Sequence, residues 1–384
     1  MNESSKPMYE RIFEALRVDI VEKKYEPGDR VPSEKELGDE YNVSRITSKK
    51  ALELLASEGY IVRQPGRGSF VSDQPAPQAK QVSQATGTPA QKTRKEDGRL
   101  LIGLVITDFA DSYGTGLIYG MEEASRQHNS YLVLRRTFGI PALEEEAIKG
   151  LLELGVDGLI VFPAQGEYFN AEILKLVINH FPFVLVDRHL KGISASSIAT
   201  DNVGAAKDGT NHLFELGHKS IAFLSPPPVD TTAIEERIEG FIQAHAEKGI
   251  VVDREVWMEN ITSSLPKHNS EENKQKDIQR IIEHLNKHPQ VTALFATEFN
   301  ISQIAYQAVK QMGKSVPEDY SIVCFDCPET NGKYPFTHLS QNQHEMGRSA
   351  FENVLRLRSG QSVPSKILLD ASLVISDSTG PVKP

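Results

Sequence analysis

VPSEKELGDEYNVSRITSKKALELLASEGYIVRQPGRGSFV, residues 31–71, predicts the fold of the N-terminal part of this chain. Ser33 and Glu36 form a capping-box pair, which starts a helix that runs through Tyr41. A tight turn follows, and Ser44 can cap a second helix, which ends at Gly59. Two short strands, 60–63 and 69–71, then surround a glycine-rich turn. The stretch therefore predicts two helices followed by a small hairpin.

An amphipathic helix is expected before this stretch. Met8, Ile12, Leu16 and Ile20 recur every four residues and give one apolar stripe, and Pro27-Gly28 then breaks the chain. Three helices followed by a hairpin are typical of a winged helix-turn-helix. We predict this fold for residues 1–72.

The second helix of a helix-turn-helix enters the major groove of DNA, so its first residues should be polar or cationic. Ser44, Arg45, Thr47 and Lys49 meet this requirement. Arg67 lies between Gly66 and Gly68, where missing side chains let the backbone approach phosphates or the minor groove. The alternative is a solvated basic face on a small helical domain.

The same stretch resembles the winged-helix domain of the GntR family of bacterial transcription factors. The matching pieces are Pro32-Ser33-Glu34, Val43-Ser44-Arg45, Thr47, Lys50-Ala51-Leu52, Glu58-Gly59 and Gly66 to Val71. The resemblance implies that Lys35, Ser44, Arg45, Thr47, Lys49, Gly66, Arg67 and Gly68 contact DNA. Lys35 and Lys49 stand where the family usually carries arginine, and Ser48 stands where a valine or leucine normally packs.

Residues 73–99 are rich in Gln, Ala, Pro, Thr and Lys and nearly lack large apolar residues, which predicts a flexible linker. The net charge of −10 comes almost wholly from the residues after this linker. DNA binding must therefore rely on a local basic face of the N-terminal domain rather than on overall charge.

After the linker, apolar strand-like runs alternate with helix-length amphipathic stretches. The runs include 101–106, 132–134, 158–162, 183–186, 221–224, 293–296 and 321–325. Alternation of this kind predicts α/β structure, with parallel sheets covered by helices on both faces. Residues 100–384 are too many for one such sheet, so we expect two lobes with a cleft between them.

The segments IGLVITDFADSY, FPFVLVDRHL, IATDNVGAAKDGTNHLFELGHKSIAFL, VPEDYSIVCFDC and SQNQHEMG resemble the LacI/GalR effector domain, a fold like that of periplasmic binding proteins. They occur in the family's order. A GntR-type domain joined to a LacI-type domain is the arrangement of the arabinose repressor group of bacterial regulators. The resemblance implies a repressor of carbohydrate-utilisation genes whose operator binding responds to a small effector, such as arabinose or a related sugar.

Carboxylates, guanidinium groups and aromatic rings in a cleft suit the paired hydroxyls of a sugar. Following the family residue by residue, the resemblance implies effector contacts from Asp111, Tyr113, Asp187, Arg188, Arg237, Glu298, Asp326 and Gln341. Arg237 and Asp326 are expected to be the main polar anchors. The alternative is that these charges lie on surface loops or in structural ion pairs.

One departure from the family concerns the ligand. Glu298-Phe299 stands where the family usually has Asn-Asp, so a carboxylate replaces an amide and an aromatic ring replaces an acid. The effector can therefore differ from arabinose.

The composition excludes several classes of protein. Two cysteines exclude a disulfide framework, and the polar N-terminus and the lack of long apolar runs predict a cytoplasmic chain without a membrane span. We expect no cofactor, no metal site and no enzyme activity; operator DNA, the effector and a second copy of the chain are the expected partners. A transporter's solute-binding protein and an α/β enzyme remain the alternatives, although the first leaves residues 1–72 without a purpose.

Overall fold

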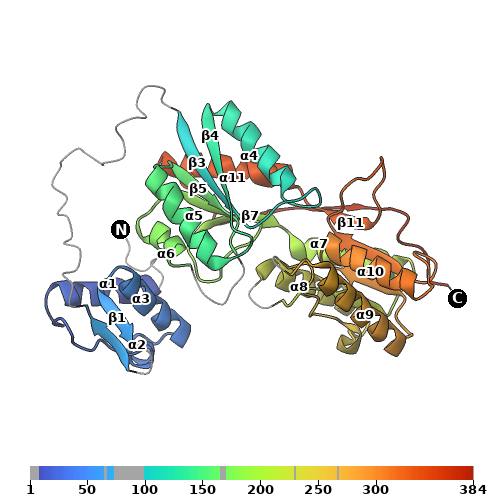
Figure 1. Cartoon of the computed structure of the whole chain (residues 1–384), viewed down its shortest axis with the longest axis horizontal. Helices are drawn as coiled ribbons and strands as arrows, with labels where there is room; N and C mark the ends of the chain where they lie inside the picture. The colour runs from blue at the N-terminus through green and yellow to red at the C-terminus, as the bar shows by residue number, and fades with distance from the viewer. Residues whose placement is uncertain are drawn as a thin grey trace.

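The computed structural model describes residues 8–64, 67–72, 99–164, 170–228, 231–265 and 268–383. Figure 1 shows a small N-terminal domain beside a larger domain with two lobes. The linker predicted for residues 73–99 lies outside the described residues except for Arg99. Among the described residues, no helix has the length and apolar character that crossing a bilayer requires.

The N-terminal domain has the predicted winged helix-turn-helix arrangement. Its elements are α1 (Met8–Val21), α2 (Glu34–Tyr41), α3 (Arg45–Ser57) and the antiparallel pair β1 (Ile61–Gln64) and β2 (Gly68–Val71). The capping box is present: the Glu36 amide donates to Ser33 Oγ at 3.3 Å, and the Ser33 amide donates to the Glu36 carboxylate at 2.7 Å. The apolar stripe of α1 packs on Leu37 and Leu55 in the core.

Lobe 1 contains a six-stranded parallel sheet in the order β12-β7-β6-β5-β3-β4. The strands are β3 (Leu100–Ile106), β4 (Ser130–Arg136), β5 (Gly158–Val161), β6 (Phe183–Val186), β7 (Ser196–Thr200) and β12 (Lys366–Leu369). Ile102 and Leu104 face helices α4 (Thr115–Gln127) and α11 (Gln343–Arg358). Leu101 and Val105 face the opposite side, which α5 (Pro141–Leu154) and α6 (Ala171–Ile178) cover. Helices thus cover both faces, as the alternating pattern predicts.

Lobe 2 contains a five-stranded sheet in the order β13-β11-β10-β9-β8. Its strands β8 (Ile221–Leu224), β9 (Ala293–Ala296), β10 (Ser321–Phe325) and β11 (Thr337–Ser340) are parallel, and β13 (Ser372–Val374) is antiparallel. The helices are α7 (Asn202–Glu215), α8 (Thr232–Lys248), the short 3-10 helix η2 (Arg254–Val256), α9 (Glu271–Lys287) and α10 (Phe299–Gln311). Phe223, Phe241, Phe295 and Phe325 form the aromatic centre of its core.

The chain crosses between the lobes after β7, after β11 and after β12. The carboxyl ends of β6 and β10 meet the space between the lobes, and each continues into an aspartate with a left-handed backbone. These are Asp187, with φ of 72°, and Asp326, with φ of 54°. Left-handed non-glycine residues are uncommon and are enriched for Asp and Asn. The left-handed backbone at each aspartate ends the strand, and both residues line the space between the lobes.

Candidate functional site

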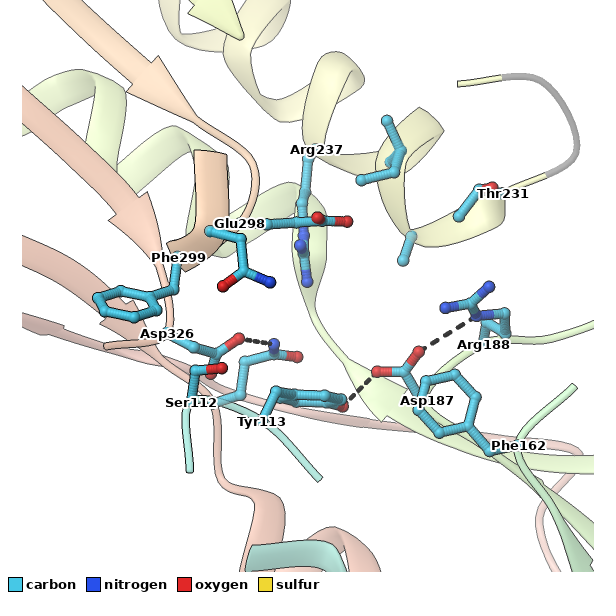
Figure 2. A pocket seen from close by; sticks show the side chains of 14 residues that line it. Ser112, Tyr113, Phe162, Asp187, Arg188, Thr231, Arg237, Glu298, Phe299 and Asp326 are labelled. Atoms are coloured by element: carbon cyan, nitrogen blue, oxygen red, sulfur yellow. Dashed lines mark hydrogen bonds and ion pairs between the residues drawn. The ribbon is translucent and has the colours of Figure 1, made fainter. Parts of the chain in front are cut away.

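A cavity of about 150 Å³ lies between the two lobes. Figure 2 shows side chains from both lobes and from the β11–α11 crossover pointing into the same space. The structure brings together seven of the eight residues expected at an effector site, namely Tyr113, Asp187, Arg188, Arg237, Glu298, Asp326 and Gln341.

Asp111 is the exception among the predicted residues. The backbone groups of Ala110 and Tyr113 hydrogen-bond to each other, which leaves Asp111 exposed in the turn between them. Ser112 and Tyr113 line the cavity instead. Asp111 is not among the described residues that line the cavity, and its contact with an effector stays a prediction.

Tyr113, Asp187 and Arg188 form a hydrogen-bonded row on the lobe 1 wall (Figure 2). The Tyr113 hydroxyl donates to Asp187 Oδ1, and Arg188 Nε donates to Asp187 Oδ2 at 3.2 Å. The Arg188 guanidinium also lies 4.8 Å from the centre of the Phe162 ring. Burial and the neighbouring Asp187 charge raise the pKa of Tyr113 well above its usual value, so its hydroxyl stays protonated. This row offers a fixed set of donors and acceptors to a ligand.

Arg237 is the main cation of the lobe 2 wall. It lies on α8 and is buried, and its Nε donates to Asn202 Oδ1 at 2.9 Å. One terminal nitrogen donates to the Thr297 carbonyl oxygen at 2.7 Å, and the guanidinium lies 3.8 Å from the centre of the Phe325 ring. These contacts use two of the five N–H donors of the group and leave the others for a ligand.

Asp326 and Gln341 connect the cavity to the β11–α11 crossover. Gln341 Nε2 donates to Asp326 Oδ2 at 2.6 Å, and the Thr200 hydroxyl donates to Gln341 Oε1 at 2.6 Å. Burial raises the pKa of Asp326 to about 7, although the positive charge of Arg237 acts to lower it. The carboxyl group therefore changes its protonation state near neutral pH.

Glu298 and Phe299 begin α10 at the edge of the cavity. Burial raises the pKa of Glu298, while the charge of Arg237 acts in the opposite direction. Both residues line the cavity, so the two positions that depart from the family pattern lie where a ligand would meet them.

Sequence reasoning missed several residues that line the cavity. These are Ser112, Phe162, Thr231, Ala233, Ile234 and Asn300. Phe162 directly follows β5, so the rule that ligands bind at the carboxyl ends of strands could have found it. Thr231, Ala233 and Ile234 carry no such signal, because only the folded position of α8 brings them to the cavity.

The set of groups suits binding rather than covalent chemistry. Carboxylates and guanidinium groups can bind vicinal hydroxyls, and Phe162 and Phe299 add aromatic surface for the C–H face of a ring. The cavity is small, which favours a ligand the size of a monosaccharide.

The predicted DNA-binding residues of the N-terminal domain cluster at the start of α3. Ser44 caps the helix by accepting from the Thr47 amide. Arg45 is exposed, and its Nε donates to Glu34 at 3.0 Å, which leaves the terminal nitrogens for a base edge. Lys49 lies one turn further along, with its Nζ 3.8 Å from Glu53. Lys35 is exposed at the start of α2.

The turn of the hairpin carries the remaining predicted DNA contacts. Gly66 lies outside the described residues. Arg67 is exposed, and Gly68 has φ of 116°, a conformation that side-chain-bearing residues rarely adopt. Contact of these residues with DNA stays a prediction.

The structure explains why α3 carries Ser48 at a position where an apolar residue usually packs. Ser48 is fully buried, and its hydroxyl donates to the Glu34 carbonyl oxygen at 2.6 Å and to the Arg45 carbonyl oxygen at 3.2 Å. The Glu34 carbonyl belongs to the first turn of α2, so Ser48 fixes the two helices of the motif to each other.

Ser48→Ala is expected to lower the stability of the N-terminal domain by about 1–3 kcal/mol, because it removes the donor to a buried carbonyl group. Calorimetry of the full chain would show a lower transition temperature for this domain. Ser359→Ala is the matched control, since the Ser359 hydroxyl also donates to a helix carbonyl but is exposed. An unchanged transition in Ser48→Ala would contradict this explanation.

Two family profiles match the chain. The profile described as "Bacterial regulatory proteins, gntR family" matches residues 8–71, and the profile described as "Periplasmic binding protein-like domain" matches residues 210–379. The first covers the winged helix-turn-helix. The second covers most of lobe 2 and also α11 and β12 of lobe 1.

Comparison with curated proteins finds relatives over nearly the whole chain. An arabinose metabolism transcriptional repressor of Geobacillus stearothermophilus is 27% identical and is aligned over 99% of both chains. A protein of the same name from Halalkalibacterium halodurans is 25% identical, over 98% of this chain and 97% of the relative. Both alignments therefore span nearly the full length of this chain and of two proteins named as transcriptional repressors.

Among solved structures, a LacI family transcriptional regulator from Enterococcus faecium with bound ribose is similar in fold. It has a TM-score of 0.60 and 24% identity, and the match covers 74% of this chain and all of that one. At this identity, the match shows the fold of the two-lobed domain.

Proposed function

Because this chain joins a GntR-type winged-helix domain to a LacI-type, periplasmic-binding-protein-like domain, we propose that it represses carbohydrate-utilisation genes under the control of a small sugar-like effector. The N-terminal domain binds operator DNA, and the cavity between the lobes binds the effector. The observation that carries the proposal is the cavity itself, where seven residues expected from the family pattern meet.

A thermal-shift screen of the full chain against sugars and sugar phosphates tests the effector-binding part. A ligand that binds only the folded state raises the melting temperature. Gel shifts on genomic fragments test the DNA-binding part and separate a regulator from a solute-binding protein or an enzyme. A chain that binds a sugar but shifts no fragment at any salt concentration would overturn the repressor proposal.

The effector is proposed to be a neutral monosaccharide, arabinose or a related sugar. The names of two relatives refer to arabinose metabolism, and the small cavity fits this size of ligand. Glu298 distinguishes this chain from the family pattern, which has an asparagine at this position. An ionised carboxylate accepts hydrogen bonds but cannot donate them. The screen should therefore include sugars that differ in the position of one hydroxyl group.

The proposal includes a cytoplasmic homodimer. One winged helix contacts little DNA, and regulators of this kind usually bind pseudo-palindromes as dimers. We expect the two-lobed domain to supply most of the interface. Sedimentation of the full chain should give a dimer at micromolar concentration; a monomer at that concentration would contradict this part of the proposal.

Asp326 makes the affinity for a neutral sugar depend on pH. Its pKa of about 7 in the ligand-free protein means that the carboxyl is mostly protonated at pH 6 and mostly ionised at pH 8. Sugar hydroxyls that donate to Asp326 favour the ionised form, so affinity should fall as pH decreases, by up to about tenfold between pH 8 and pH 6. Calorimetric titration at both pH values measures this change.

Asp326→Asn is the control for this pH dependence, because the amide cannot titrate in this range. The variant should bind more weakly but with the same affinity at pH 6 and pH 8. The same pH dependence in the variant would assign the titration to another group.

A further inference from the structure

The N-terminal domain contacts lobe 1 through one side of α3. Helix α3 lies beside α6 of lobe 1 (Figure 1), and the Lys50 ammonium group donates to the Gly192 carbonyl oxygen at 3.1 Å. Leu174 of α6 belongs to the same buried cluster as the core residues of the N-terminal domain, and Ile178 and Ile193 pack against this cluster. These residues form one continuous contact, which we call the docking contact: Lys50 on one side, and Leu174, Ile178, Gly192 and Ile193 on the other.

Helix α6 is built to be covered on two sides. Ile173 and Leu176 face the core of lobe 1, whereas Leu174 faces the N-terminal domain and is only 1% exposed. A helix that is apolar on all sides is normally buried. If the outer side of α6 faced solvent, the helix would need apolar residues only on the side of Ile173 and Leu176, which packs on lobe 1. The sequence of α6 therefore agrees with a partner on its outer side, and the N-terminal domain is that partner in this structure.

Lys50 gives a second, polar reason to regard the contact as specific. Lysine is almost never fully buried unless it is paired, yet only 4% of Lys50 is exposed. Its ammonium group lies 4.7 Å from the centre of the Tyr9 ring in addition to its bond to Gly192. Burial lowers the pKa of Lys50 to about 8, so the group is still largely charged at neutral pH and needs these partners.

The segment that receives Lys50 begins at the cavity. Asp187 and Arg188 line the cavity, and the chain reaches Gly192 only four residues after Arg188. Lobe 2 holds the same segment from the other side: the Thr232 hydroxyl donates to the His189 carbonyl oxygen at 3.2 Å, and Lys191 pairs with Glu235 of α8. The position of α8, which carries Arg237, therefore sets the position of the surface on which the N-terminal domain docks.

We propose that the N-terminal domain docks on lobe 1 through this contact, that docking competes with operator binding, and that an effector between the lobes stabilises the docked state. The proposal rests on the proposed function for the identity of both ligands. It adds a route from the cavity to the DNA-binding helix that does not pass through residues 73–98.

Competition follows from the shape of the DNA groove. A helix with its side chains is about 10–12 Å wide and the major groove is about 12 Å wide, so the groove walls contact both flanks of an inserted helix. Lys50 follows Lys49 directly on α3 and lies on a flank next to the one that carries Arg45 and Lys49. In the docked state lobe 1 occupies the side of α3 on which Lys50 lies. The domain must leave lobe 1 before the DNA can surround α3.

Leu174→Lys tests the docking contact, because it places a charge in the apolar part of the contact and lets the lysine reach water once the domains separate. Leu154→Lys is the matched control: it is the same substitution in lobe 1, at the end of α5, where the leucine is 51% exposed. Hydrogen exchange of the full chain without ligands should be faster over residues 172–178 and 189–193 in Leu174→Lys than in the parent and the control.

Operator titrations then test the competition. Leu174→Lys should bind operator at least ~5-fold more tightly than the parent without effector, and effector should weaken its operator binding less. Lys50→Met changes the docking contact on the side of the N-terminal domain, because it removes the hydrogen-bond donor to the Gly192 carbonyl oxygen. This variant should also bind operator more tightly than the parent, although it loses a positive charge. Exchange and operator affinity equal to the parent in both variants, or weaker operator binding in both, would overturn the proposal.

The readouts distinguish this proposal from the proposed function. If the parent binds operator and responds to the sugar while Leu174→Lys behaves like Leu154→Lys, only docking is wrong. If the parent itself binds no operator, the regulatory function is wrong, and the exchange experiment still decides whether the domains dock.

Discussion

Arg237→Ala is expected to abolish the response of operator binding to effector and to leave ligand-free operator affinity within about twofold of the parent. Arg237 is buried at the cavity, stacked on Phe325, and has donors to spare for a ligand. Its loss removes the main cation of the lobe 2 wall and leaves Asp326 without its opposing charge. Fluorescence anisotropy of a labelled operator fragment, with and without the sugar found by thermal shift, measures the response.

Arg254→Ala is the control for this variant. Arg254 also stacks on an aromatic ring of lobe 2, 4.6 Å from the centre of Trp257, but it does not line the cavity. It should keep the full response.

Because Arg237 holds Asn202 and the Thr297 carbonyl in place, its removal also weakens lobe 2. Asp326→Asn, which keeps the shape of the side chain, is therefore the second variant. If both Arg237→Ala and Asp326→Asn still respond like the parent, the effector does not bind in this cavity.

Arg45→Ala is expected to weaken binding to the specific operator by about 1–3 kcal/mol, or roughly 5- to 150-fold, and to relax the preference at one base position in each half-site. The side chain is 81% exposed at the start of α3, and only its Nε is used by Glu34. Loss of such an exposed ion pair changes stability little. The effect should therefore appear in DNA binding and not in the melting temperature.

The control is Arg11→Ala, which removes the same charge from an exposed position on α1. Titrations against the operator and against random DNA, at one salt concentration, separate base contacts from phosphate contacts. Equal weakening on both DNAs would show that Arg45 contacts only phosphate.

Local signals explain why the N-terminal domain was predictable from its sequence. Ser33 and Glu36 cap each other across one helical turn, and Ser44 caps α3 within three residues, so the interactions that start these helices lie inside short windows. Ser48 could not be explained in the same way. Its partner, the Glu34 carbonyl, is fourteen residues away and belongs to another helix.

The two-lobed domain was predictable where its strands are apolar on both sides. Strands such as β8, β9 and β10 read as continuous apolar runs because both faces of the sheet are covered. Strands β7 and β11 do not stand out, because Ser196, Ser197, Thr337 and Ser340 interrupt the apolar pattern at the crossovers.

Most of the cavity was predictable because its residues follow strands or crossovers that the family pattern locates. Asp187 and Asp326 lie directly after β6 and β10, where ligands of such sheets bind. The positions of Thr231 and Ile234 depend on how α8 meets lobe 1, and the docking contact joins residues far apart in the sequence, such as Lys50 and Gly192, which are 142 positions apart. Neither arrangement leaves a pattern in a short stretch of sequence.

Control of DNA binding by the cavity is tested by a titration of the parent protein with its operator at increasing concentrations of the sugar that stabilises it. If the cavity controls DNA binding, saturating sugar weakens operator binding at least ~5-fold, and operator DNA weakens sugar binding by the same factor. Operator affinity that stays the same at saturating sugar would contradict the claim that the cavity controls DNA binding.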